Sequence, residues 1–139
     1  MNHSTCPLCQ PAAPEHILWQ DGRCRVILVD EPDYPAYCRV IWREHVAEMS
    51  DLTEADRQHV MRVVLAVESA LRTQVKPDKI NLASLGNQVP HLHWHVIARF
   101  RDDRHFPDAI WAAPRREPGN PHPLPDLAAF CAEIARILA

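Results

Sequence analysis

The sequence predicts an α+β fold: a roughly five-stranded antiparallel sheet with a long helix packed on one face and a short C-terminal helix. Two patterns support this fold class. Short runs of β-branched and aromatic residues alternate with turn residues, and one stretch, 53–75, has apolar residues at helical spacing. A length of 139 residues fits one domain, 1–139. We expect its core over roughly residues 6–100, with 101–139 forming an extended segment and the final helix.

The first strands are predicted on either side of a tight turn. Residues 16–20 and 23–30 flank Asp21-Gly22, a hairpin signal. The prolines of the following segment, Glu31-Pro32-Asp33-Tyr34-Pro35, force a loop. Residues 37–42 form the next strand.

The long helix is predicted over residues 53–75. Thr53 and Asp56 make a start similar to a capping box, and Lys76-Pro77-Asp78 ends the helix. The apolar positions that recur at helical spacing are Val60, Met61, Val64, Leu65, Val67 and Leu71. We expect this helix to cover a face of the sheet.

The rest of the chain divides into a strand at 79–85, a histidine-bearing strand, and a tail. Residues 101–125 are charged and rich in proline, which predicts a largely irregular segment. Residues 126–138 form a short amphipathic helix. Trp111 is an isolated large apolar residue in the irregular segment, and such residues often dock onto another surface.

Composition excludes several classes of partner and location. A formal charge of −3 without a basic block argues against a nucleic-acid surface. No apolar run approaches the roughly 18 residues of a membrane span, and the first residues do not resemble a signal peptide. Five cysteines, an odd number, favour reduced thiols and a cytoplasmic location. Cys24, Cys38 and Cys131 lie in apolar runs and are predicted as small core residues.

A histidine occupies every second position of one predicted strand, at His91, His93 and His95. Alternate side chains of a strand point to opposite faces, so the imidazoles share one face. The residues between them are apolar and face the core: Leu92, Trp94 and Val96. Three interpretations are open: a half-exposed strand face, a set of zinc ligands, or a nucleophile with neighbours that orient or protonate.

A second pattern lies near the N-terminus, where residues 6–9 read Cys-Pro-Leu-Cys. A Cys-x-x-Cys pair is half of many zinc sites. By itself it also fits a redox pair or a loose N-terminal arm.

The segment His91-Leu92-His93-Trp94-His95-Val96-Ile97 resembles the signature of the histidine-triad family, His-apolar-His-apolar-His-apolar-apolar. The resemblance extends over roughly residues 6–100 and includes the turn Gly86-Asn87-Gln88-Val89. It implies a HIT-like fold, a small-molecule nucleotide as substrate, and a homodimer that joins two sheets. The chain departs from the family at Val40-Ile41-Trp42 and at Ile97-Ala98-Arg99, where the family often has proline as the third and second residue respectively.

The resemblance also implies roles for the histidines. His93 is the expected nucleophile, which attacks the α-phosphorus of a nucleotide and forms a nucleotidyl-histidine that water hydrolyses. His95 is expected to bind the phosphate, and His91 to bind zinc or orient its neighbours. The implied substrates are a nucleoside phosphoramidate, an adenylylated compound or a dinucleoside polyphosphate, and no catalytic cofactor is expected.

Further site residues follow from the same resemblance. Asp30 matches the position that binds the ribose hydroxyls, with Asp33 as its rival, and Asn87 and Gln88 should face the leaving group. Gln88 stands where the family commonly has a hydroxyl residue, and an amide cannot deliver a proton.

Zinc is expected as a structural ion held by Cys6, Cys9, His45 and His91, the ligand set implied by zinc-containing relatives. The resemblance also suggests that Trp111 lies at the dimer interface or over a nucleotide pocket, with simple packing on its own subunit as the alternative. Two other functions stay open: a zinc-dependent hydrolase with the histidines as metal ligands, and a nucleotide-binding module without turnover.

Overall fold

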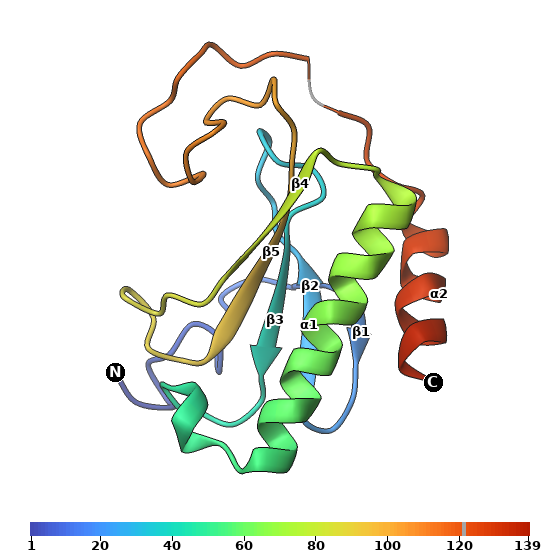
Figure 1. Cartoon of the computed structure of the whole chain (residues 1–139). Helices are drawn as coiled ribbons and strands as arrows, with labels where there is room; N and C mark the ends of the chain where they lie inside the picture. The colour runs from blue at the N-terminus through green and yellow to red at the C-terminus, as the bar shows by residue number, and fades with distance from the viewer. Residues whose placement is uncertain (121) are drawn as a thin grey trace.

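A computed structural model of the chain, which describes residues 1–120 and 122–139, confirms the predicted α+β fold. Its sheet has five antiparallel strands in the order β1-β2-β3-β5-β4 (Figure 1). The strands are β1 (His16–Gln20), β2 (Cys24–Leu28), β3 (Cys38–Trp42), β4 (Lys79–Ala83) and β5 (His93–Arg99). The central pair, β3 and β5, joins the two halves of the chain, and β1 and β4 form the edges.

The predicted hairpin at Asp21-Gly22 is confirmed and has a side-chain anchor. Oδ1 of Asp21 accepts hydrogen bonds from the backbone N–H groups of Arg23 and Cys24, at 2.8 and 2.9 Å. An Asp side chain that binds the backbone two and three residues on is a common turn-former. The anchor fixes where β2 begins.

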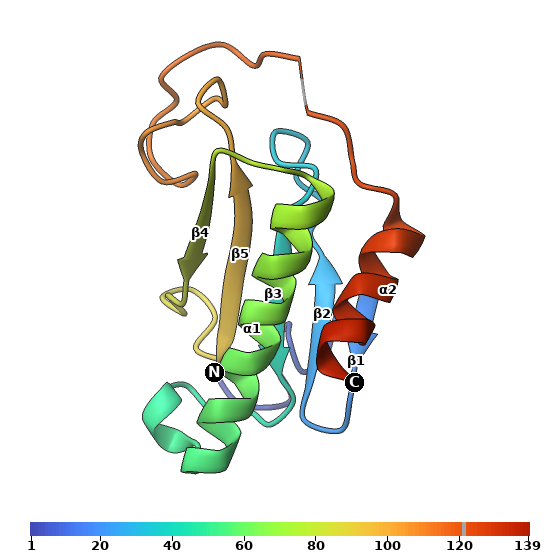
Figure 2. The ribbon, with the colours of Figure 1, turned by 45° about the vertical axis from the view of Figure 1, so that its right-hand side comes forward.

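Two helices cover one face of the sheet (Figure 2). Helix α1 (Glu54–Gln74) begins after Thr53, whose hydroxyl accepts the N–H of Asp56, as its sequence predicts. Helix α2 (Leu127–Leu138) begins after Asp126, which caps it in the same way, and packs on α1 and β1. A short 3-10 helix, η1 (Met49–Asp51), precedes α1. No helix among the described residues is both long and apolar enough to span a membrane.

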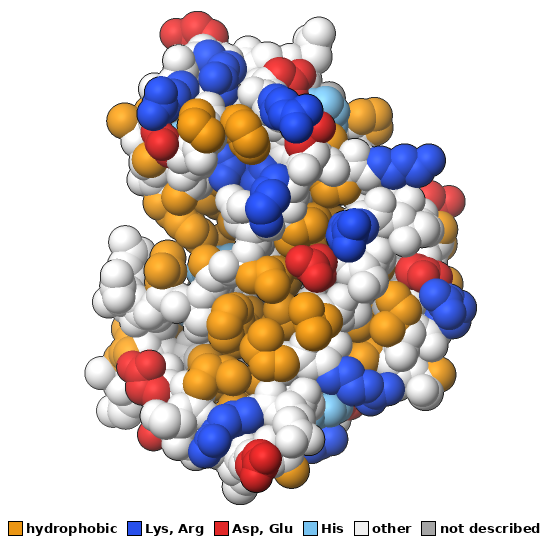
Figure 3. All heavy atoms as spheres, viewed as in Figure 1, with side chains coloured by type: hydrophobic (Ala, Val, Ile, Leu, Met, Phe, Trp, Pro, Cys, Tyr) orange, Lys and Arg blue, Asp and Glu red, His pale blue; other side chains and the backbone are white. Residues whose placement is uncertain are grey.

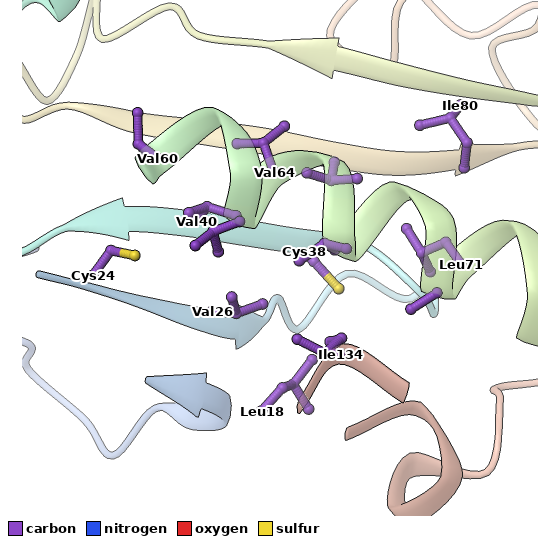
Figure 4. Packing of buried hydrophobic residues seen from close by; sticks show 14 of the residues in the cluster. Leu18, Cys24, Val26, Cys38, Val40, Val60, Val64, Leu71, Ile80 and Ile134 are labelled. Carbon is purple, nitrogen blue, oxygen red and sulfur yellow. The ribbon is translucent and has the colours of Figure 1, made fainter. Parts of the chain in front are cut away.

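The main core lies between this face and the helices (Figure 4). Side chains of β2 and β3 meet those of α1, and Leu18 of β1 meets Ile134 of α2. Leu92 and Val96, predicted as core residues, are buried, and Trp94 is partly buried. Cys24 and Cys38 are buried here as predicted, and Cys131 packs against the cluster.

The opposite face of the sheet carries the histidines and is covered at two places. The N-terminal arm packs Cys6 and Leu8 on Ile27 and Ile41. At the other end, Ile97 is buried against Tyr34 and Tyr37, with Ile110 of the segment after β5 packed on this cluster. The strip between these two covers holds the side chains that are described below.

The chain after β5 is irregular, as predicted, up to α2. Pro121, within the predicted segment 101–125, lies outside the described residues. Figure 1 shows the segment arching over the end of the sheet where β5 finishes. The segment therefore lies close to the histidine face of the sheet before the chain reaches α2 on the other face.

Candidate active site

The turn before β5 delivers the histidines. Gly86 has φ of 72°, a left-handed conformation that favours glycine, and its substitution by a residue with a Cβ would strain the turn. Strand β5 begins at His93, so His91 lies two residues before the strand rather than within it. The extended segment still pairs with its neighbours, because the N–H of Leu92 donates to the carbonyl of Val46 at 2.7 Å.

His93 is held in one tautomer by the backbone. Its Nδ1 lies 2.6 Å from the carbonyl oxygen of His91, which can only accept a hydrogen bond, so Nδ1 carries the proton. Burial lowers the pKa of His93, which favours the neutral ring at pH 7. Nε2 therefore keeps a free lone pair, the requirement for a nucleophile.

His95 lies beside it, with ring centroids 5.0 Å apart. Its Nδ1 is 2.5 Å from the hydroxyl of Tyr37, and burial raises the pKa of that phenol, so it stays protonated. We assign the hydroxyl as the donor, because a buried O–H without an acceptor is unfavourable. Burial, followed by the charges of His93 and Arg39, lowers the pKa of His95 to about 4. His95 is then a neutral ring with its proton on Nε2, suited to donate a hydrogen bond.

Trp111 packs directly on His95. Its ring lies 4.9 Å from the His95 ring, nearly perpendicular at 65°, and half of the residue is exposed. The tail of the same chain therefore supplies an aromatic wall to the histidine face. The contact is made within one chain, so the position of Trp111 at a dimer interface or over a nucleotide pocket stays a prediction.

A buried ion pair anchors the segment that carries Trp111. Arg99, 1% exposed, donates from Nε and Nη2 to the two carboxylate oxygens of Asp103 at 2.8 and 3.0 Å. The hydroxyl of Tyr34 and the backbone N–H of His105 also donate to this carboxylate. The pair therefore fixes the turn that follows β5.

The predicted zinc ligands come together next to the start of β5. Donor atoms of Cys6, Cys9, His45 and His91 all lie within 4.8 Å of one another. Nδ1 of His91 is 3.5 Å from Sγ of Cys6, 3.3 Å from Sγ of Cys9 and 3.1 Å from Nδ1 of His45. A tetrahedral Zn²⁺ with ordinary bond lengths separates such atoms by roughly 3.3–3.6 Å, so this donor set fits zinc.

The surroundings of the cluster also suit a metal. Nε2 of His91 donates to the carbonyl of Trp42 at 2.6 Å, which frees Nδ1 to act as a ligand. Arg25 donates to the carbonyl of Leu8 at 2.8 Å and so holds the Cys-x-x-Cys turn on the sheet. Among the described residues, neither His93 nor His95 belongs to a metal-ligand cluster. Of the three histidines around β5, the geometry therefore favours His91 as a metal ligand and leaves His93 and His95 free for substrate.

The remaining predicted residues lie around the rim, and within the described part of the chain their side chains make no hydrogen bond to the three histidines. Asn87 and Gln88 are exposed in the turn before β5. Asp30 is exposed beyond the end of β2, whereas its rival Asp33 pairs with Arg104 at 3.3 Å. The structure thus leaves Asp30 the freer of the two carboxylates.

Two residues of the site were missed from the sequence. Tyr37 and Arg39 alternate with Cys38 in the third predicted strand, and the register pairs Arg39 with His95. The alternation predicts that Tyr37 and Arg39 share one face of the strand, but only the tertiary structure shows that this strand pairs with β5. Together, the face offers a nucleophilic nitrogen, a hydrogen-bond donor, a cation and an aromatic wall.

Comparison with known proteins agrees with this geometry. The sequence profile of the HIT domain matches residues 10–102. A bis(5'-adenosyl)-triphosphatase of Saccharomyces cerevisiae is 31% identical over 93 residues, which cover 63% of this chain and 45% of that protein. The chain thus spans less than half the length of the curated relatives that it matches.

Solved structures are similar over most of the chain. A histidine triad protein from Bradyrhizobium japonicum has a TM-score of 0.71 at 28% identity, covering 90% of this chain and 91% of that one. One from Marinobacter aquaeolei VT8 has a TM-score of 0.69 at 26% identity, covering 91% and 90%. A Zn-bound histidine triad family protein from Mycobacterium smegmatis shares the fold, with a TM-score of 0.68 at 21% identity, covering 98% and 97%.

Proposed function

The chain belongs to the HIT domain family, and on that premise we propose that it is a nucleotide hydrolase or nucleotidyl transferase that works through a covalent nucleotidyl-His93. The observation that carries the proposal is the 2.6 Å hydrogen bond from Nδ1 of His93 to the carbonyl of His91. It directs the lone pair of Nε2 to the open face. A fixed tautomer of this kind is what nucleophilic catalysis by an imidazole requires.

The reaction has two steps. In the first, Nε2 of His93 bonds to the α-phosphorus while the bond from phosphorus to the leaving group breaks, and the leaving group keeps the electron pair. In the second, water attacks the same phosphorus, the phosphorus–nitrogen bond breaks, its electron pair returns to Nε2, and the proton lost by the water passes to solvent. His95 donates its Nε2 proton in a hydrogen bond to a phosphoryl oxygen in both steps.

The choice of leaving group follows from what the site can protonate. His95 stays neutral near pH 7, since its pKa is lowered to about 4, and Gln88 has no proton to give. A phosphate leaving group departs as an anion, whereas an amine needs a proton. This disfavours phosphoramidates relative to adenylylated compounds and dinucleoside polyphosphates, and we favour the last because the yeast relative is named for that substrate class.

Three residues are proposed to hold the rest of the nucleotide and its leaving group. Asp30 is exposed at the end of β2 and would accept hydrogen bonds from the two ribose hydroxyls. Asn87 in the turn before β5 would contact the leaving group, together with Gln88. Asp33, the alternative to Asp30, already pairs with Arg104 and is therefore less available to the ribose.

Zinc is proposed as a structural ion on Cys6, Cys9, His45 and His91. The donor distances fit a tetrahedral site, and a structure of the same fold is described as Zn-bound. Bound there, zinc would cross-link the N-terminal arm to the sheet, while His93 carries out the chemistry. A cytoplasmic location would keep the two thiols reduced and available.

A homodimer is proposed through the edge at β4. Figure 3 shows apolar side chains gathered on the face that carries α1, and Leu65 and Leu85 are about half exposed, at 48% and 53%. The unpaired edge of β4 could extend one sheet into the next. Light scattering at micromolar concentration should give twice the chain mass, and a monomer would contradict the proposal.

The test of the function is a search for the covalent intermediate. Mixing the protein with α-³²P-labelled diadenosine triphosphate and quenching within milliseconds should leave an acid-labile, base-stable label on the peptide that contains His93. His93→Ala should abolish label and turnover, while His95→Ala should retain a measurable rate, since one lost donor costs about two to three orders of magnitude.

The matched control is His16→Ala, a change of an exposed histidine on β1, which should behave as the unmodified protein. Label on a cysteine or carboxylate, or near-normal turnover by His93→Ala, would refute the histidine nucleophile. Activity lost to a chelator and restored by metal, without label, would indicate a zinc-dependent hydrolase. Tight nucleotide binding with neither label nor turnover would indicate a binding module.

A further inference from the structure

Arg39 occupies the position next to His95 on the histidine face. The two residues are Cα partners in the antiparallel pair of β3 and β5. Side chains of directly opposed residues leave a sheet on the same face, with Cβ atoms roughly 4.5–5.5 Å apart. The side chain of Arg39 therefore leaves the sheet beside the imidazole of His95, which is proposed to bind phosphate.

The guanidinium of Arg39 has no acidic partner among residues 1–120 and 122–139. Arg25, Arg99 and Arg104, the other buried or half-buried arginines near this face, each pair with a carboxylate at 3.3 Å or less. Arg39 pairs with none in the part of the chain that the structure describes, and its Nε is buried without a hydrogen-bond partner. A half-buried cation in this state is unfavourable unless a ligand supplies the missing anion.

The position of Arg39 keeps it open to a ligand. In the next row of the sheet toward the zinc cluster, Ile41 is covered by the N-terminal arm. In the next row the other way, Ile97 packs with Tyr34 and Tyr37 of the connection from β2 to β3, and Ile110 adds to this cover. The face of Tyr37, whose centroid is 5.6 Å from the guanidinium carbon of Arg39, supports the side chain between these covers.

We propose that Arg39 binds the phosphoryl group that His93 attacks, as a phosphate-binding residue in addition to His95. The inference rests on the proposed function. Negative charge on the non-bridging oxygens of phosphorus is shared with positioned donors in the transition state, and a guanidinium presents two N–H groups to such oxygens. Arg39 supplies this charge at neutral pH, where His95 can supply only a neutral donor.

A guanidinium can also stack on a nucleobase, so the test separates phosphate from base. Isothermal titration with AMP and GMP, and with adenosine and guanosine, gives the contribution of the phosphate as the ratio of nucleoside to nucleotide Kd. Arg39→Gln should weaken nucleotide binding by roughly ten- to a hundredfold and leave nucleoside binding unchanged. Arg39→Lys should recover part of the loss, because lysine keeps the positive charge but lacks the paired N–H donors of the guanidinium.

The matched control is Arg62→Gln, which removes the same charge from an exposed position on α1, across the sheet. It should leave all four dissociation constants unchanged. The inference is overturned if Arg39→Gln weakens nucleoside and nucleotide binding equally, if it changes neither, or if the unmodified protein binds no nucleotide more tightly than its nucleoside. These binding ratios do not depend on turnover, so a missing covalent intermediate would refute the proposed function while leaving Arg39 testable.

Discussion

Replacing Asp103 by Asn should destabilise the protein and loosen the wall of the active site. Asp103 lies under the segment that follows β5, where Arg99 donates two hydrogen bonds to its carboxylate. The N–H groups of Phe100 and Phe106 also donate to it, at 3.1 and 2.8 Å. The amide of Asn keeps the size of this group but removes its charge and two of its acceptor lone pairs.

The expected loss follows from the charge. The ion pair and hydrogen bonds overcome the effect of burial and lower the pKa of Asp103 from 3.8 to about 2. A shift of this size corresponds to roughly 2–3 kcal/mol of stability at pH 7, and leaving Arg99 buried without its partner costs about 3–5 kcal/mol. Asp103→Asn should therefore lower the free energy of unfolding by about 2–5 kcal/mol and Tm by on the order of 10 °C.

The same shift predicts how the loss depends on pH. The unfolded chain protonates this carboxyl near pH 3.8 and the folded chain near pH 2, so the ion pair contributes fully above about pH 5. Its contribution falls as the pH drops through 4 toward 2. The gap in stability between the unmodified protein and Asp103→Asn should therefore narrow over that range.

Urea denaturation at pH 7 and pH 3 measures both effects. Asp102→Asn is the matched control, because the neighbouring carboxylate is exposed and pairs only with His122 in the described residues; it should unfold as the unmodified protein does. Comparing two variants of the same chain removes the contribution of the zinc ligands, which also protonate in acid. Equal stabilities of the two variants, or a gap for Asp103→Asn that does not change with pH, would refute the reasoning.

Three further changes test the site. Cys6→Ser should release about one zinc per chain, as measured by metal analysis, and lower Tm, whereas Cys131→Ser on α2 should keep the metal. If the unmodified protein contains no metal and Cys6→Ser has the same Tm, the proposed zinc site is wrong. Trp111→Ala should alter relative rates with different leaving groups without lowering Tm, since half of the residue is exposed; unchanged kinetics across several leaving groups would contradict its role. Tyr37→Phe should reduce turnover by roughly tenfold or more while nucleotides still bind, and ¹⁵N NMR should show His95 losing its single tautomer; a tautomer that persists would contradict the assigned hydrogen bond.

Most of the fold could be read from local patterns. The predicted strand at 16–20 has the observed bounds, and the helix predicted at 53–75 is observed at Glu54–Gln74. These elements depend on the spacing of apolar residues and on caps such as Thr53, which are properties of neighbouring residues. Strand ends were less accurate, because pairing with other strands decides where a strand stops: the run at 79–85 pairs only to Ala83.

The shared face of His93 and His95 was also predictable, since it follows from the period of two in a strand. Their tautomers were not. Each depends on what meets Nδ1: for His93 a backbone carbonyl two residues back, and for His95 a phenol 58 residues away in sequence. Arg39 became part of the site only because β3 lies beside β5 in the sheet.

The Cys-x-x-Cys spacing by itself indicated half of a metal site, and the structure places the other half beside it. His91 is 85 residues from Cys6 in sequence, and His45 is 36 residues from Cys9. The Arg99–Asp103 pair lies within one turn of chain, yet only the folded structure shows that it is buried and that it holds Trp111 over His95. Periodicity and short motifs describe residues that are close in sequence, whereas these contacts depend on strand order and on how a long loop closes, which short-range patterns do not encode.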